Sequence, residues 1–213
     1  MRRYSAMDRL LMRLSQNLAT KPPPADAPSA LPGHNENTDA PALDPQARRL
    51  SANLMRVNHA GEVAAQGLYH GQAITAHEEP IREQLLKAAD EEQAHLQWCE
   101  QRLRELDDRP SVFRPFWYGA SMAMGAVAGL LGDKWSLGFV AETEAQVSEH
   151  LDQHISRLPE QDQRSRNILQ AMQADEERHG REAKDSGGLP LPEFVRKTMR
   201  GVAQVMKQTA FRI

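Results

Sequence analysis

Two short acidic segments of this chain combine carboxylates with histidine at a spacing that suits metal binding. DEEQAH and DEERH each contain the pattern Glu-x-x-His. On a helix, side chains three residues apart lie on one face, so each pair could bind a metal ion from one side. A single copy is weak evidence, because Glu and His also occur on solvated helix faces. The two pairs are Glu92 with His95 and Glu176 with His179.

Two single glutamates lie at matching distances before these pairs. Glu62 precedes Glu92 by 30 residues (92 − 62), and the midpoint falls in the HEEP turn. Glu144 precedes Glu176 by 32 residues (176 − 144), and the midpoint falls in the RLPEQ turn. In an antiparallel hairpin, residues equidistant from the turn lie at one height, because both helices rise about 1.5 Å per residue. Each hairpin therefore brings one Glu level with one Glu-x-x-His pair.

Two single glutamates and two Glu-x-x-His pairs, supplied by four helices, are the ligand set of ferritin-like di-iron carboxylate proteins. Carboxylates neutralise and bridge two iron ions, while each imidazole supplies a neutral nitrogen and positions remain open for dioxygen. We therefore predict two iron ions per subunit. The predicted ligands are Glu62, Glu92, His95, Glu144, Glu176 and His179.

Neighbouring acids compete for two of these positions. Glu91 is four residues from His95, which is also a same-face spacing, and Glu177 adjoins Glu176. Glu92 and Glu176 are preferred, because only this choice gives both motifs the same three-residue step.

The helix of Glu144 holds two competitors, Glu142 and Glu149. Glu144 is preferred because apolar residues after it predict an inward-facing stripe, from which Glu149 points away. That stripe consists of Ala145, Val147 and Leu151. Three histidines outside the motifs are interpreted as surface groups or as groups that support the ligands: His77, His150 and His154.

Long segments with apolar residues at three- and four-residue spacing must position these ligands. Strand-like alternation is not sustained, and turns rich in Pro and Gly separate the segments. The predicted fold class is all-α, a ferritin-like four-helix bundle with additional membrane-associating helices. The predicted helices span about residues 48–77, 81–107, 114–131, 134–157, 161–186 and 191–211.

Three regions are predicted along the chain. Residues 1–20 form a basic amphipathic segment, without the continuous apolar region and cleavage site of a secretory signal. Residues 21–46 form a linker that holds seven of the thirteen prolines. Residues 47–213 form the ferritin-like di-iron domain.

The composition excludes several classes of function. The net charge of −3 and the pI near 6.2 give no basis for a nucleic-acid partner. Cys99 is the only cysteine, so the chain has no disulfide framework and no thiolate metal site. A metal site must be built from His, Asp and Glu.

Three segments predict peripheral membrane association. Residues 115–132 carry no charge but contain four glycines, so we expect them to dip into one leaflet or cover a hydrophobic channel, with a core helix as the alternative. The last helix has a basic face that suits an anionic membrane surface, although a solvated face would look the same. Residues 1–20 add a third basic amphipathic segment.

Several motifs together resemble the demethoxyubiquinone hydroxylases, the di-iron monooxygenases of ubiquinone biosynthesis. These are NHAGE at residues 58–62 with the following Tyr69 and Gly71-Gln72, EEQAH, the helix of Glu144, and DEERH. The resemblance runs from about residue 47 to the C-terminus. It implies the same six iron ligands, with Glu92 and Glu176 bridging, and His150 and Tyr69 as candidate supporting groups.

The resemblance also implies a reaction and its partners. The expected activity is hydroxylation of a demethoxyubiquinol-type polyprenyl benzoquinol ring with O2, a late step of ubiquinone biosynthesis. A ferritin-like protein that binds or detoxifies iron is the alternative. The sequence has no nucleotide-binding glycine motif, so any reductase is a separate protein. The expected location is the cytoplasmic face of the bacterial cell membrane, with the mitochondrial inner membrane as the alternative.

Two positions depart from the family pattern. Animal members commonly have an acidic residue where this chain has Asn58, and a Tyr where it has Leu151. Leu151 follows Glu144 by two helical turns on the same face, so we expect a hydroxyl near the metal to be missing.

The stretch RVNHAGEVAAQGLYHGQ places glycines in a helix beside Glu62, where each Gly costs roughly 0.5–1 kcal/mol relative to Ala. Ala60, Ala64, Gly67 and Gly71 form a stripe of small residues along this helix. We predict that the stripe walls a path for the quinone ring to the iron, with close helix packing as the alternative.

Overall fold

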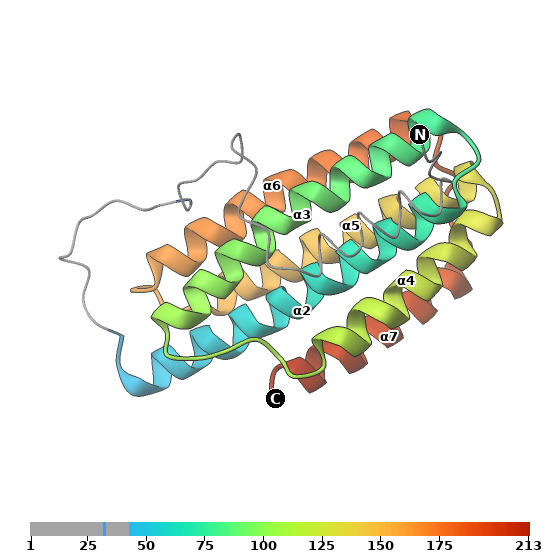
Figure 1. The fold of residues 1–213 in the computed structure, drawn as a ribbon. Coiled ribbons are helices and arrows are strands. Elements are labelled where there is room, and N and C mark those ends of the chain that lie inside the picture. Colours follow the sequence, from blue (N-terminus) through green and yellow to red (C-terminus); the bar gives the residue numbers. More distant parts are fainter. Residues whose placement is uncertain (1–31, 33–42) are drawn as a thin grey trace, which may run out of the picture.

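The computed structural model describes residue 32 and residues 43–213. The predicted segment 1–20 and nearly all of the predicted linker 21–46 therefore lie outside the described residues. The described part is all-helical, as predicted (Figure 1). Its helices are α2 (Pro45–Thr75), α3 (Glu79–Glu105), α4 (Arg114–Leu130), α5 (Asp133–Arg157), α6 (Gln163–Asp185) and α7 (Glu193–Ala210).

The first helix begins earlier than predicted. Asp44 caps α2, and its side chain accepts hydrogen bonds from the backbone N–H groups of Gln46 and Ala47, at 2.9 and 2.8 Å. Pro45 occupies the first turn, where its fixed φ suits a helix and its missing N–H costs nothing. The helix thus includes the last two residues of the predicted linker, because Asp-Pro-Gln is a helix start.

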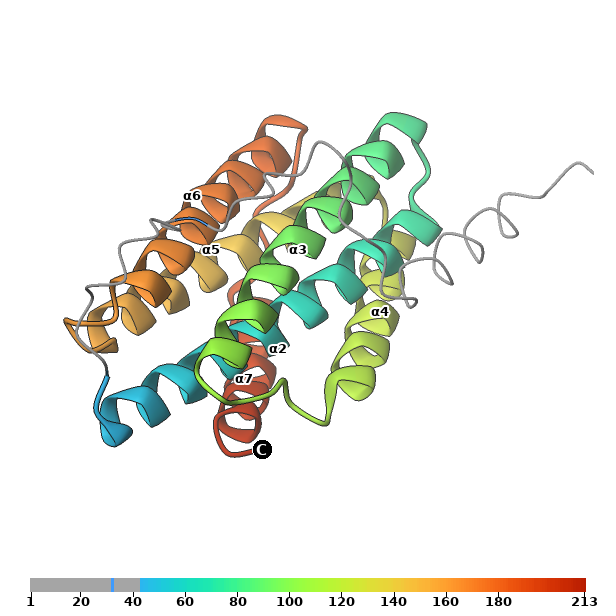
Figure 2. The ribbon, with the colours of Figure 1, turned by 60° about the vertical axis from the view of Figure 1, so that its left-hand side comes forward.

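Two antiparallel hairpins form the four-helix bundle. One consists of α2 and α3, the other of α5 and α6, and α4 connects them (Figures 1 and 2). Two apolar clusters fill the interior at different heights. One includes Leu54, Cys99, Leu151 and Met172, and the other includes Tyr69, Leu85, Val140 and Ala183. Along every helix of the bundle, the predicted metal ligands fall between these two clusters.

The helix α4 packs along α2 so closely that their backbones touch. A Cβ atom placed on Gly67 would lie 2.4 Å from the carbonyl oxygen of Tyr118, and one placed on Gly71 would lie 2.0 Å from that of Met122. Gly125 of α4 approaches the Leu68 carbonyl oxygen of α2 in the same way, at 2.1 Å. The predicted substrate path along this stripe is wrong at Gly67 and Gly71, because the backbone of α4 fills the space.

Large apolar side chains are exposed on α4 and α7. Both helices pack on α2 and α5, on one side of the bundle (Figures 1 and 2). Among the described residues, no helix combines the length and apolarity needed to cross a bilayer. The exposed residues include Phe116, Val127 and Leu130 of α4, and Phe194, Val202 and Val205 of α7.

Candidate metal centre

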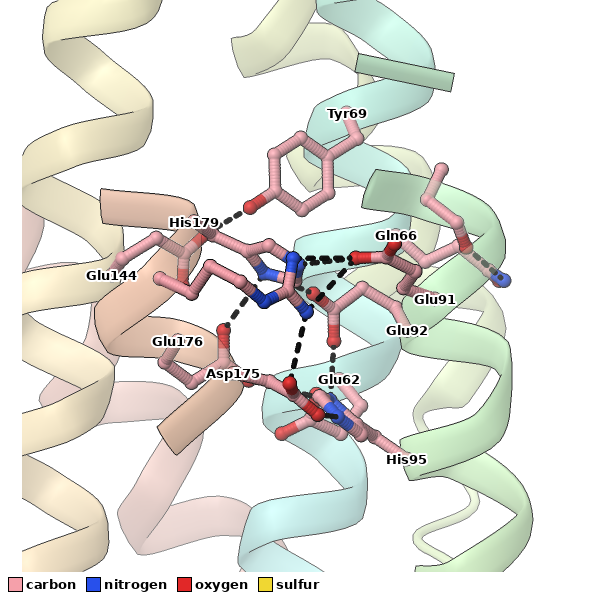
Figure 3. Close-up of polar contacts among 12 residues, drawn as sticks. Glu62, Gln66, Tyr69, Glu91, Glu92, His95, Glu144, Asp175, Glu176 and His179 are labelled. Carbon is pink, nitrogen blue, oxygen red and sulfur yellow. Dashed lines mark hydrogen bonds and ion pairs between the residues drawn. The ribbon is translucent and has the colours of Figure 1, made fainter. Parts of the chain in front are cut away.

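The fold brings the six predicted ligands together in the middle of the bundle (Figure 3). Each of α2 and α5 contributes one Glu, and each of α3 and α6 contributes one Glu-x-x-His pair. All six side chains are buried. The potential ligand atoms form two groups, and the atoms within each group lie close enough together to bind one ion. The first contains Glu62, Glu92, His95 and Glu176, and the second contains Glu144, Glu176 and His179.

Glu92 and Glu176 lie between the two histidines. Glu92 places Oε2 2.9 Å from Nδ1 of His95 and Oε1 3.4 Å from Nδ1 of His179. Glu176 places Oε1 3.4 Å from Nδ1 of His95 and Oε2 3.6 Å from Nδ1 of His179. Each carboxylate therefore offers one oxygen toward each histidine, the arrangement that a carboxylate bridging two ions requires.

Several inward-facing polar atoms of the site have no hydrogen-bond partner. A buried polar group without a partner costs about 1–3 kcal/mol, and more when it is charged. A cation coordinated at these positions would remove that cost, so the residues present fit a metal centre. The atoms are Oε1 of Glu92, Oε2 of Glu144, both carboxylate oxygens of Glu176 and Nδ1 of His179.

The far side of each histidine is held by a carboxylate from the opposite hairpin. Nε2 of His95 lies 3.1 Å from Oδ2 of Asp175, and Nε2 of His179 lies 2.7 Å from Oε2 of Glu91. A carboxylate on the second nitrogen fixes the tautomer and the ring orientation, which leaves Nδ1 free for a metal. Arg178 joins both carboxylates, at 2.9 Å from Asp175 and 3.2 Å from Glu91.

Sequence reasoning missed this support. The sequence motifs indicate Glu91 only as a rival ligand and indicate no role for Asp175 or Arg178. The signal was present, because each motif has an acid immediately before its Glu-x-x-His glutamate, Glu91 in one and Asp175 in the other. These two acids can be assigned to the histidine of the opposite hairpin only once it is known that α3 and α6 face each other.

The glutamates of the site divide into two types by pKa. Burial raises the pKa of Glu62 well above its ordinary value, and it does the same to Glu144. Burial also acts on Glu176, but the imidazoles of His179 and His95, at 3.6 and 3.4 Å, outweigh it and lower the pKa of Glu176 to about 2. Positive charge between the helices thus stabilises the central carboxylates, and two divalent cations would supply such charge.

Glu144 is the only acid of its helix that points into the site. Tyr69, a predicted supporting group, donates a hydrogen bond to Oε1 of Glu144, and its ring packs edge-on against His179 (Figure 3). Glu142 instead accepts a hydrogen bond from Gln146, at 2.7 Å. Glu149 and Glu177 are exposed. Placing Ala145 on the inward stripe was wrong, since Ala145 is exposed and the stripe runs through Leu137, Val140, Ala141 and Leu151.

The three histidines that the sequence predicts as surface or supporting groups fall into two environments. His77 is exposed beside Asp133. His154 is buried, with Nδ1 2.8 Å from Oδ1 of Asn58, and the ring of His150 packs against it at 3.8 Å between centroids. His150 therefore contacts His154, which in turn hydrogen-bonds Asn58 on the helix of Glu62. Leu151 lies in the apolar cluster, where the family pattern would place a hydroxyl.

The pair of buried histidines is expected to make the fold sensitive to acid. Burial lowers the pKa of His150 to about 3 and that of His154 to about 2. The unfolded chain protonates both near pH 6.5, so below that pH it binds more protons than the folded chain. The free energy of unfolding should fall by about 1.4 kcal/mol per pH unit for each histidine.

Thermal melting between about pH 7.5 and about pH 5 measures this effect. His154→Gln should give a shallower dependence of the melting temperature on pH, because one titrating group is removed. Identical slopes for the two proteins would show that His154 is not held neutral by the fold.

A bundle that buries two glutamates and two Glu-x-x-His pairs at mid-height belongs to the ferritin-like class of helical metal-site proteins. Within that class, residues 49–210 match the model of the family described as Ubiquinone biosynthesis protein COQ7. The chain belongs to this family.

Two curated relatives support the same placement. A protein of Xanthomonas euvesicatoria pv. vesicatoria (strain 85-10) is 50% identical over 216 residues, which cover 100% of this chain and 97% of the relative. A protein of Ralstonia pickettii (strain 12J) is 55% identical over 196 residues, covering 92% of this chain and 90% of the relative. Both are named 3-demethoxyubiquinol 3-hydroxylase.

Proposed function

We propose that this protein is a di-iron monooxygenase that hydroxylates the ring of 3-demethoxyubiquinol with O2 in ubiquinone biosynthesis. The names of its close relatives supply the reaction. The observation that carries the chemistry is the position of Glu92 and Glu176, each with one oxygen toward each histidine. Two ions with shared carboxylates suit this geometry, and iron is the metal that such sites use with dioxygen.

Each residue then has a distinct role. Glu92 and Glu176 would be shared by the two iron ions. Glu62 and His95 would complete the protein ligands of one ion, and Glu144 and His179 would complete those of the other. Bound iron would supply the activation of O2, with one oxygen entering the ring and the other leaving as water. Tyr69 orients Glu144 by donating a hydrogen bond to it.

Electrons would come from the quinol itself or from a separate reductase. Iron storage is the less favoured alternative, because both relatives described above are named as hydroxylases. The two functions differ in what they accumulate: a hydroxylase releases product stoichiometrically, whereas a storage protein gathers ferric iron.

Metal analysis combined with product identification tests the proposal. The purified protein should bind two iron ions per chain and convert a demethoxyubiquinol analogue to a product heavier by one oxygen. With labelled O2, mass spectrometry should find the label in the new hydroxyl group. Two bound ions without product would favour iron storage, and product without bound iron would contradict the di-iron assignment.

We also propose that α4 and α7 associate with the surface of a bacterial cell membrane, on its cytoplasmic face. A polyprenyl quinol resides in the bilayer, so the enzyme must meet it there. The exposed apolar residues of α4 and α7 lie beside exposed basic groups such as Lys197 and Arg200. Apolar side chains with neighbouring basic groups favour anionic lipid surfaces.

Negative charge introduced on this face is expected to weaken vesicle binding strongly. The double variant Val127→Glu/Val205→Glu should bind vesicles of anionic phospholipid at least about tenfold more weakly, because each buried Val contributes roughly 1.5 kcal/mol and a buried Glu is costly. Ala174→Glu on α6, where the alanine is also exposed, is the control for added negative charge. Equal co-sedimentation of all three proteins with vesicles would rule out this face.

A further inference from the structure

The two sides of the bundle give different access to the metal centre. On one side, α4 and α7 cover α2 and α5 (Figures 1 and 2). These two helices present the exposed apolar residues. On the other side, α3 and α6 carry the two histidines and have charged outer faces. There the outer nitrogens of the histidines contact Asp175 and Glu91, whose side chains are partly exposed, at 35% and 32%.

A narrow cavity on this second side reaches the centre. Its volume of about 10 Å³ is at the lower limit for one water molecule. The inner wall includes Tyr69 and His179, which are buried, and the outer wall includes Lys87, whose side chain is 67% exposed. The lining of this small cavity therefore extends from an exposed lysine to two residues of the metal centre. Its remaining lining residues include Gln84, Leu85, Ala88, Glu91, Val140 and Glu182.

Arg178 links two residues that line this cavity, Glu91 of α3 and Glu182 of α6. Its guanidinium group reaches from α6 to Glu91 of α3 at 3.2 and 3.3 Å. The same group contacts Asp175 at 2.9 Å and Glu182 at 3.5 Å. Because Arg178 is about one-third exposed, its contacts are individually weak and can exchange with water.

We propose that the opening between α3 and α6 is the entrance for the metal ions, and that Arg178 closes it. The inference rests on the proposed metal centre. A hydrated divalent cation cannot pass an apolar, lipid-facing side without a large desolvation cost. On the α3 and α6 side it meets the carboxylates of Glu91, Asp175 and Glu182 before it reaches His179.

Arg178 is therefore expected to change the rates at which metal ions enter and leave, but not the affinity of the centre for them. Arg178 is not among the six inward-facing ligands, so displacing it changes the barrier to entry and exit in the same direction. Its positive charge also repels an incoming cation as long as the guanidinium group stays between the carboxylates. Ala88 lines the same cavity, so a larger side chain there should narrow the path and slow both steps.

Binding of Co²⁺ to the metal-free full-length protein tests the proposal, followed by visible absorption, with release measured after addition of EDTA. Arg178→Gln should speed uptake and release by about fivefold to tenfold, as expected for removing a few partly exposed ion pairs. Ala88→Leu should slow both. The controls are Arg181→Gln, an exposed arginine on the same helix, and Ala123→Leu, an exposed alanine of α4.

The outcomes are distinguishable from a failure of the metal centre itself. If the unmodified protein binds no Co²⁺, the proposed centre is wrong. If it binds two ions but Arg178→Gln and Ala88→Leu leave both rates at the values of their controls, the entrance lies elsewhere. If Arg178→Gln speeds release alone while the affinity falls equally, Arg178 only supports the ligands, and the entrance proposal is overturned.

Discussion

Glu176→Ala is expected to lose metal binding and hydroxylation together. Glu176 is the one residue common to both groups of potential ligand atoms, so its removal takes a ligand from each ion. Turnover should fall by roughly a thousandfold or more, because a metal that supplies the chemistry stabilises the transition state by several kcal/mol. Metal content by atomic spectroscopy should fall from two ions per chain to one or none.

The same substitution is expected to leave the metal-free protein folded. Both oxygens of Glu176 are buried without hydrogen-bond partners, so removing this carboxylate also removes a desolvation cost. The melting temperature of the metal-free variant should therefore stay near that of the unmodified protein. Glu177→Ala, at the exposed neighbouring acid, is the control and should change neither property. Two ions retained by the Glu176 variant would overturn the ligand assignment.

Gly71→Val is expected to be strongly destabilising. A Cβ atom there would lie 2.0 Å from the Met122 carbonyl oxygen and 2.8 Å from the Ala126 nitrogen, both backbone atoms of α4. The two helices must separate to admit a side chain, which costs about 3 kcal/mol or more. For a chain of this size the melting temperature should fall by about 6–12 °C.

Gly61→Ala on the same helix is the matched control. A Cβ atom at Gly61 would meet nothing within 4 Å, so alanine should stabilise α2 by about 0.5–1 kcal/mol. Opposite shifts in melting temperature for the two variants would show that contact with α4, and not helix propensity, requires Gly71. An unchanged melting temperature for Gly71→Val would contradict the close packing of α2 and α4.

The comparison of Gly71 with Glu62 shows what local sequence can and cannot specify. Glu62 could be placed from sequence because equal distances from a turn set equal heights in a hairpin, whatever the rest of the fold does. The role of Gly71 could not be predicted from sequence, because a small residue suits a ligand path and close packing of a neighbouring helix equally well. Only the position of α4 decides between them, and it favours packing.

The sequence by itself determined the all-α fold, the helix order and the six inward-facing residues. These depend on the helical period and on turn residues, which act over a few positions. The tertiary structure decided which outer carboxylate supports which histidine, because Asp175 with His95 and Glu91 with His179 are pairs across two hairpins. It also decided that Ala145 faces outward and that His154 is buried on Asn58. Such contacts depend on the rotation of each helix about its axis, which is set when all four helices pack together.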